Sequence, residues 1–292
     1  MSYQLRAHPR YGFRQVVPTP SPEEIARYYA QEFYASAYPG VNDSALAAID
    51  RDRDFYEGHY QDLLDSIVEL LGRQPGELDL LDIGCGWSQA LRFWQQRGVR
   101  GHGFDPAPEA IEHGRKLGLE VRQAGMERMD VFGRNFDAVT LLNVLEHLAD
   151  PEAVVREIRE RVIRPGGVLV IDVPNEFNAF QVAGQAVHGL PEWWVAPPAH
   201  LNYFSGSTLR ALLEANGFEV RLLEASFPLE MFLLMGDKYV GDAELGRACH
   251  LRRVAFEANL RRQGKAAEMR AFYRALAAQD LGRQVVAFAV AV

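Results

Sequence analysis

A short apolar segment that runs into a glycine loop constrains the fold of this chain more than any other feature. The segment is DLLDIG, residues 79–84, and it is followed by Cys85, Gly86 and a helical stretch that begins at Ser88. A strand, a tight glycine turn and a helix form the first unit of a doubly wound sheet, in which ligands bind at the carboxyl ends of the strands. Glycine in such a turn lets the backbone approach a ligand with no Cβ in the way. This stretch therefore predicts an α/β fold with a ligand site around residues 82–88.

Predicted strands and helices alternate through the rest of the chain. Apolar runs of strand length lie at 79–84, 99–105, 119–125, 136–143, 168–174, 219–227 and 284–292. Helical patterns lie among them, at 106–118, 151–163, 206–218, 242–262 and 266–278. This alternation predicts a seven-stranded, mostly parallel sheet with right-handed crossovers and helices on both faces.

Two further regions precede and interrupt that sheet. Residues 1–22 carry four prolines and are predicted to form an extended arm, and helices are predicted over 22–36 and 52–72. We therefore expect an N-terminal arm and helical lid, 1–75, and a ligand-binding domain, 76–292. That domain has a cap insertion at about 175–205 and a helical insertion at about 229–280. Aromatic side chains are frequent in the 22–36 helix and in the cap, so we expect the two to face each other over the site.

The glycine loop departs from the dinucleotide fingerprint in a way that indicates the ligand. The fingerprint places a third glycine where this chain has Gln89, and the bulky Trp87 stands just before it. Asp105 ends the second predicted strand, roughly 20 residues beyond the loop, where an acidic side chain commonly holds ribose hydroxyls. The pattern favours a nucleoside without a pyrophosphate.

The composition of the chain disfavours several classes of binding partner. A net charge of −8 argues against a nucleic-acid or anionic-membrane partner, which would favour clustered Lys and Arg. Two distant cysteines, Cys85 and Cys249, support neither a disulfide framework nor a multi-cysteine metal site. No carboxylate cluster stands out, so we expect no metal ion. We expect a cytoplasmic location, because no signal peptide or membrane span is evident, and the sequence carries no signature of an oligomeric state.

Four segments within about 79–220 carry a family resemblance: DIGCGWS, GFDPAPEAIE, FDAVTLLNVLEHLADP and VIRPGGVLVIDVPN. With their surroundings, they resemble the class I S-adenosylmethionine-dependent methyltransferases. The resemblance is to the small-molecule branch that includes ubiquinone-pathway enzymes. It implies a Rossmann-like sheet of seven strands whose last strand is antiparallel, and S-adenosylmethionine as the cofactor.

The same resemblance implies roles for the residues that match the family's motifs. Those that would contact the methionine end of the cofactor, its sulfonium or its amino group are Asp82, Gly84, Gly86, Asn143 and Val144. Those that would hold or border the adenosine are Asp105, Pro106, Met126 and Glu127. Trp87 and Ser88 complete the loop, and Ser88 stands where the family often has glycine.

Catalytic candidates lie after the fourth strand, in the cap and in the first helix. They are His147, His200, Tyr28, Asn175 and Tyr203. A histidine suits the removal of a proton from a hydroxyl acceptor, and aromatic rings can stabilise a sulfonium. Each candidate also has a structural interpretation: His147 could orient Glu146, Asn175 could cap a strand end, and the aromatic residues could pack the lid and cap.

The favoured reaction is methyl transfer from S-adenosylmethionine to a small-molecule acceptor, in bacterial secondary metabolism. Azetidine-2-carboxylate synthases also look like methyltransferases, so cyclisation of the cofactor itself, with release of 5′-methylthioadenosine and no second substrate, stays open. A non-catalytic sensor of the cofactor is a third possibility. The long aromatic cap favours an enclosed site and therefore an enzyme.

Overall fold

The computed structural model describes residues 3–21, 24, 47 and 50–292. The helix predicted over 22–36, and with it Tyr28, lies outside the described residues. Within the described part of the chain, no helix is both long and apolar enough to cross a membrane.

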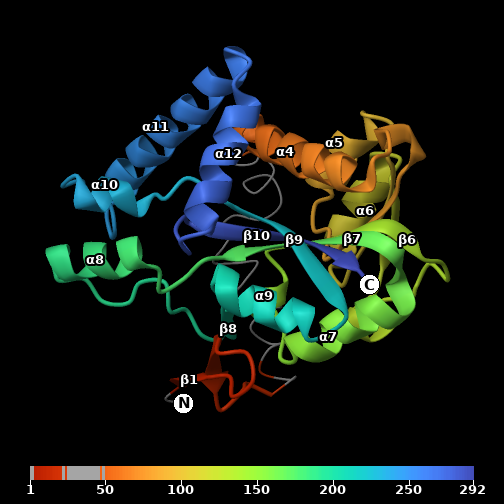
Figure 1. Cartoon of the computed structure of the whole chain (residues 1–292), viewed down its shortest axis with the longest axis horizontal. Helices are drawn as coiled ribbons and strands as arrows, with labels where there is room; N and C mark the ends of the chain where they lie inside the picture. The colour runs from red at the N-terminus through yellow and green to blue at the C-terminus, as the bar shows by residue number, and fades with distance from the viewer. Residues whose placement is uncertain (1–2, 22–23, 25–46, 48–49) are drawn as a thin grey trace.

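The main sheet has seven strands in the order β5-β4-β3-β6-β7-β10-β9 (Figure 1). Their bounds are β3 Asp79–Ile83, β4 Arg100–Asp105, β5 Glu120–Gln123, β6 Phe136–Leu142, β7 Ile163–Pro174, β9 Phe218–Ala225 and β10 Gln284–Ala291. Only β10 runs antiparallel to its neighbours, β7 and β9. The predicted fold, including the antiparallel last strand, is confirmed. The strand order reverses between β3 and β6, which is where a doubly wound sheet opens a ligand crevice.

Helices cover both faces of this sheet because its strands are apolar on both sides. One face is covered by α4 (Arg53–Leu71), α5 (Gln89–Gln95) and α6 (Pro108–Lys116). The other is covered by α7 (Pro151–Glu157) and α9 (Gly206–Glu214). Successive side chains of β7 alternate accordingly: Val170 packs on the α4 side and Ile171 on the α7 side.

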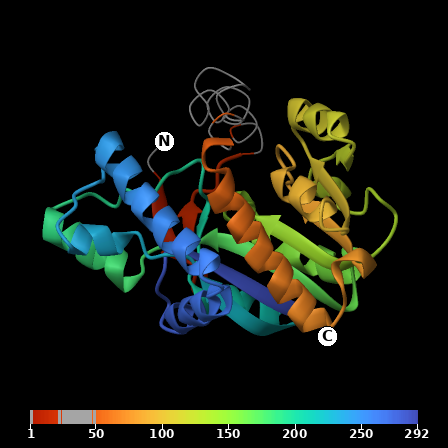
Figure 2. The same cartoon turned by 90° about the horizontal axis from the view of Figure 1, so that it is seen from above.

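The helical insertion extends the α4 face of the sheet. It consists of α10 (Glu230–Leu234), α11 (Ala243–Arg262) and α12 (Ala266–Ala277). Figure 2 shows α11 lying beside α4, and an ion pair between Arg261 and Asp62 joins the two helices. Helices α4, α11 and α12 therefore form a roof near the carboxyl ends of the central strands.

Two local predictions differ from the structure. The predicted N-terminal arm folds as a hairpin, β1 (Gln4–Ala7) and β2 (Arg14–Val17), which pairs with β8 (Asn202–Tyr203) of the cap in a small second sheet. Strand β7 begins at Ile163, before the Pro-Gly-Gly that was expected to separate a helix from a strand, because Ile163 already pairs with Phe136. A short π-helix, Ile158–Val162, links α7 to that early start.

The cap packs on this small sheet and on the insertion. Its helix α8 (Ala179–His188) contacts α10, where a Cβ on Gly184 would stand 3.0 Å from Leu233. Phe177 packs edge-on to Trp194 and beneath the guanidinium of Arg14, 3.7 Å from the ring centre. The described cap residues thus bury their aromatic rings against β2 and each other.

Candidate active site

The loop between β3 and α5 is held by one carboxylate. Asp105, at the end of β4, accepts hydrogen bonds from the backbone N–H of Gly86 at 3.0 Å and of Ala107 at 2.9 Å. Gly84 and Gly86 have φ of +70° and +46°, the left-handed region that favours glycine. A Cβ on Gly84 would stand 2.7 Å from Cγ2 of Val144. The loop is therefore fixed in a shape that only glycine fits without strain.

A cavity of about 620 Å³ opens beside this loop. It lies at the carboxyl ends of β3, β6 and β7 and at the amino end of the antiparallel β10, beneath α4, α11 and α12. Five of the residues predicted to bind the cofactor line it: Asp82, Gly84, Gly86, Trp87 and Asn143. The structure thus brings together the residues assigned to the methionine end of the cofactor.

The residues assigned to the adenosine lie outside the lining of this cavity. Asp105 is buried at the end of β4, and Pro106 is exposed just after it. In the turn that follows β5, Met126 is half-buried and Glu127 is exposed. Ser88 is buried as the residue before α5, with φ of +61°, and shapes the loop from within.

Asp82 is the buried carboxylate at the floor of the cavity. Burial raises the pKa of Asp82 to about 7, although the hydrogen bond from the Thr140 hydroxyl at 2.6 Å opposes the shift. A carboxylate in such a place gains most from a cationic partner. This buried acid and the glycine cradle fit the ammonium group and the chain of a bound amino acid, which is the form of the methionine end of S-adenosylmethionine.

The cavity also holds a histidine–aspartate pair that was not predicted from the sequence. Nε2 of His59, from α4, lies 2.8 Å from Oδ2 of Asp172, from β7. Burial alone would lower the pKa of His59, but the hydrogen bond and the charge of Asp172 raise it above its usual value. Oδ1 of Asp172 is buried and has no hydrogen-bond partner in the described part of the chain. A charged residue inside the apolar run VLVIDVP was the signal available in the sequence.

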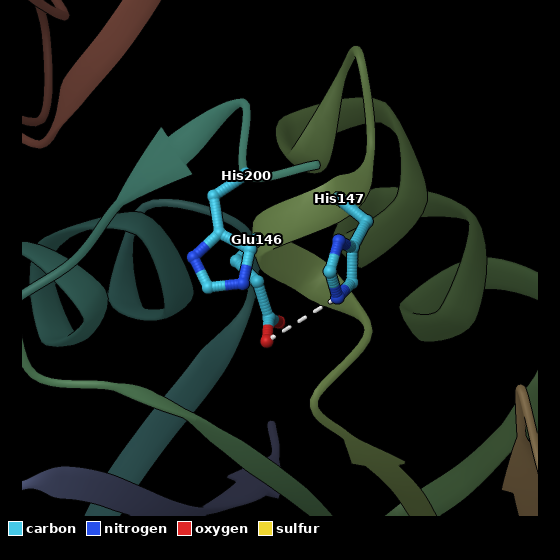
Figure 3. A group of neighbouring side chains, drawn as sticks. All are labelled: Glu146, His147 and His200. Atoms are coloured by element: carbon cyan, nitrogen blue, oxygen red, sulfur yellow. Dashed lines mark ion pairs between the residues drawn. The ribbon is translucent and has the colours of Figure 1, made fainter. Parts of the chain in front are cut away.

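The predicted bases His147 and His200 meet each other, but they do not line this cavity. Their ring centres lie 5.0 Å apart, and Glu146 lies between them (Figure 3). Nδ1 of His147 donates to the carbonyl of Ala199 at 2.7 Å if that nitrogen carries the proton. Burial lowers the pKa of His147 to about 4, despite this hydrogen bond. His147 is therefore neutral at pH 7.

Glu146, His147 and His200 could hold a metal ion. Each offers one ligand atom, and these atoms lie within 4.8 Å of one another. Nε2 of His147 is 3.6 Å from Glu146, whose other carboxylate oxygen is buried without a hydrogen-bond partner among the described residues. A carboxylate with two imidazoles is a ligand set for divalent transition metals. No such cluster was expected from the sequence, because His200 joins it only through the fold.

Asn175 and Tyr203 make bonds within the scaffold. The amide of Asn175 donates to the carbonyls of Asp280 at 2.9 Å and Gly282 at 3.2 Å, which ties the end of β7 to the chain before β10. The hydroxyl of Tyr203 donates to the carbonyl of His200 at 3.1 Å and accepts from the backbone N–H of Ala196 at 3.0 Å. Neither side chain lines the large cavity, and the expected catalytic use of both finds no support in these contacts.

A seven-stranded sheet with an antiparallel last strand, a glycine loop after its first strand and an acid at the end of its second define a class I S-adenosylmethionine-dependent methyltransferase. S-adenosylmethionine is the cofactor of this class. A family model for the methyltransferase domain matches residues 55–223, more than half of the chain. The chain belongs to this methyltransferase family.

Curated relatives and a solved structure agree with that assignment. A ubiquinone biosynthesis O-methyltransferase of Methylocella silvestris is 27% identical over 59% of this chain and 74% of its own length. One of Alkalilimnicola ehrlichii is 33% identical over 38% of this chain, and the match spans only 47% of that relative. The crystal structure of a SAM-dependent methyltransferase from Archaeoglobus fulgidus shares the fold, with a TM-score of 0.50 and 16% identity over 91% of this chain and 100% of that one.

Proposed function

We propose that this protein transfers the methyl group of S-adenosylmethionine to a small-molecule acceptor. The cavity carries the proposal. Its 620 Å³ lie on the methionine side of the glycine loop and continue past it to the ends of β7 and β10. The residues assigned to the adenosine contribute nothing to its lining. A volume in the usual range for whole ligand sites, roughly 300–1,000 Å³, leaves room for an acceptor beside the methionine chain. The names of the relatives support the same reaction.

The residues that match the family's motifs have distinct roles in this proposal. Asp82, Gly84 and Gly86 bind the methionine end, with Trp87 and Asn143 at its sides, while Val144 and Ser88 fix the loop. The group that holds the adenosine is Asp105, Pro106, Met126 and Glu127. When bound, the cofactor supplies an electrophilic methyl group. The protein aligns the acceptor in line with the breaking C–S bond and excludes water beneath the roof of α4, α11 and α12.

The cellular location and the domain organisation of the protein are parts of the same proposal. The net charge of −8 supports small-molecule chemistry without a nucleic-acid partner. Both cysteines, Cys85 and Cys249, are free and buried, which supports a reducing, cytoplasmic setting. We assign residues 1–75 to an arm and lid because α4, within that region, roofs the cavity. Bacterial secondary metabolism is the proposed context.

The test begins with the purified protein and S-adenosylmethionine alone, followed by mass spectrometry. We expect the cofactor to stay intact without an acceptor. Catechol, methyl α-D-glucoside and 2-phenylethylamine, which offer a phenol, an alcohol and an amine, are then added one at a time, followed by a bacterial cell extract. S-adenosylhomocysteine and a product heavier by one methylene establish transfer. Release of 5′-methylthioadenosine with a cyclic amino acid would establish cyclisation instead, and cofactor binding without turnover under every condition would favour a sensor.

A further inference from the structure

The His59–Asp172 pair lies at the level of the sheet where methyl transfer would occur. Asp172 pairs in register with Leu142 of β6, and its carbonyl accepts from the backbone N–H of Asn143 at 2.8 Å. One strand over, Leu141 pairs with Ile83, the last residue before Gly84. The pair is therefore two strands from the glycine loop, at the same edge of the sheet. Both members of the pair line the cavity that Gly84 and Asp82 also line.

The orientation of the pair leaves one imidazole nitrogen for the cavity. Nε2 faces the carboxylate of Asp172, so the proton of neutral His59 is held on Nε2 and the lone pair is on Nδ1. No hydrogen bond or ion pair in the described part of the chain engages Nδ1. The His59 side chain is 28% exposed, whereas that of Asp172 is 1% exposed. In such a pair the buried carboxylate fixes the tautomer of the histidine and stabilises its imidazolium form.

We propose that His59 is the general base of the transfer, that Asp172 positions it, and that the acceptor reacts through a hydroxyl group. This inference rests on the proposed methyl transfer. An oxygen lone pair of the acceptor forms the bond to the methyl carbon, and the C–S bond breaks with its electron pair left on sulfur. The hydroxyl proton goes to Nδ1 of His59, and the imidazolium later releases it to water. A hydroxyl needs such a base, because its proton is not lost readily at neutral pH.

The charges around His59 favour its protonated form. On α4 itself, Asp62 is paired with Arg261 of α11. Glu257 of α11 accepts from the hydroxyl of Tyr273 of α12 at 2.8 Å. The other charged groups that line the cavity are Asp82 of β3, Glu224 of β9, Arg253 of α11 and Arg283 next to β10. Carboxylates outnumber arginines in this lining, so a positive charge that forms on His59 is stabilised.

Two substitutions and a matched control test the assignment. His59→Gln keeps a donor toward Asp172 but removes the base, and Asp172→Asn keeps the geometry but removes the charge. His188→Gln is the control, since Nε2 of His188 also makes a 2.8 Å hydrogen bond, to the carbonyl of Leu233, and neither residue lines the cavity. Calorimetry with S-adenosylhomocysteine should give unchanged affinity for all three, which shows that the fold and the cofactor site are intact.

The rate and its pH dependence should separate catalysis from a structural role. With whichever hydroxyl acceptor the wild type methylates, His59→Gln should lower kcat about 100-fold or more and abolish the loss of rate at acidic pH. Asp172→Asn should lower kcat less and move that loss to lower pH, because the charge that raises the pKa of His59 is gone. A His59→Gln enzyme with unchanged kcat and the same acidic limb would overturn the proposal and leave methyl transfer standing.

A second measurement needs no acceptor. In ¹H–¹⁵N spectra of the S-adenosylhomocysteine complex, recorded at rising pH until His59 has lost its second proton, the neutral imidazole should carry its proton on Nε2 and none on Nδ1. A proton found on Nδ1 would remove the base from the cavity and overturn the assignment. If the wild type turns over no hydroxyl compound but methylates 2-phenylethylamine, the transfer stands and the hydroxyl assignment falls.

Discussion

Gly84→Ala gives the sharpest test of how the loop is built. Gly84 has φ of +70°, and a Cβ there would stand 2.7 Å from Cγ2 of Val144. Two penalties therefore combine. A left-handed backbone costs a non-glycine residue about 1–3 kcal/mol, and forcing a side chain into a packed site costs about 1–3 kcal/mol more. We expect the free energy of unfolding to fall by about 2–6 kcal/mol.

Two other glycines separate these penalties. Gly72, which ends α4, has φ of +62°, and nothing lies within 4 Å of its added Cβ, so Gly72→Ala carries the backbone penalty alone. Gly86 has φ of +46° and is equally open. Because Gly86 lines the cavity, Gly86→Ala should weaken cofactor binding more than it weakens the fold. The double variant Gly84→Ala/Val144→Ala should recover the part of the loss that comes from the clash.

Urea unfolding and calorimetry with S-adenosylhomocysteine measure the two effects on the same samples. Gly84→Ala should be less stable than Gly72→Ala by the clash penalty and should bind at least tenfold more weakly than wild type. If Gly84→Ala loses no more stability than Gly72→Ala and binds normally, then the loop is not the rigid cradle inferred from the contact with Val144.

Three further predictions concern buried acids and thiols. Asp105→Ala removes the acceptor of two backbone hydrogen bonds, so we expect the free energy of unfolding to fall by about 2–4 kcal/mol. Cofactor affinity, measured by calorimetry, should drop at least tenfold. Unchanged affinity would refute the assignment of Asp105 to the ribose. For Asp82, the pKa of about 7 in the fold exceeds that of the unfolded chain, so protonation favours the fold. Stability of the cofactor-free protein should be full below about pH 4 and fall as pH rises through 7, by up to about 4 kcal/mol at 1.4 kcal/mol per pK unit. Asp82→Asn should flatten that decline in urea titrations at pH 4.5 and 8, whereas a slope equal to that of wild type would contradict the burial effect. Cys85 and Cys249 are buried and burial raises the pKa of both thiols, so a thiol reagent should modify them only after unfolding; rapid labelling of the native protein would count against the packing described.

The main sheet could be predicted from local patterns because each strand and helix carries its own signal. The run DLLDI is apolar and ends at glycine, so β3 and the loop after it were predicted to within a residue. All seven strands of the main sheet and the helices α4, α6, α7, α9, α11 and α12 lie where the alternation placed them, apart from shifts at their ends. The methionine-side residues also meet as expected, because the carboxyl ends of parallel strands share one edge.

Contacts between distant elements could not be predicted in that way. His59 and Asp172 meet only because α4 crosses the sheet with this face toward β7, and the helical pattern of 52–72 gives no crossing position. His200 reaches Glu146 and His147 only through the path of the cap. The cap was expected over the site, yet Phe177 packs edge-on to Tyr203 beside β2, because the hairpin of the N-terminal arm offers it an apolar surface.

The sequence by itself thus determined the class of fold, the position of the glycine loop and the acid that holds it, since periodicity and turn chemistry are local properties of the chain. The tertiary structure alone decided which titratable groups share the cavity. For this reason the base that we propose from the structure is His59, whereas the candidates from the sequence were His147 and His200. Side-chain neighbours are set by how a helix crosses a sheet, and packing between elements far apart in the sequence determines that crossing.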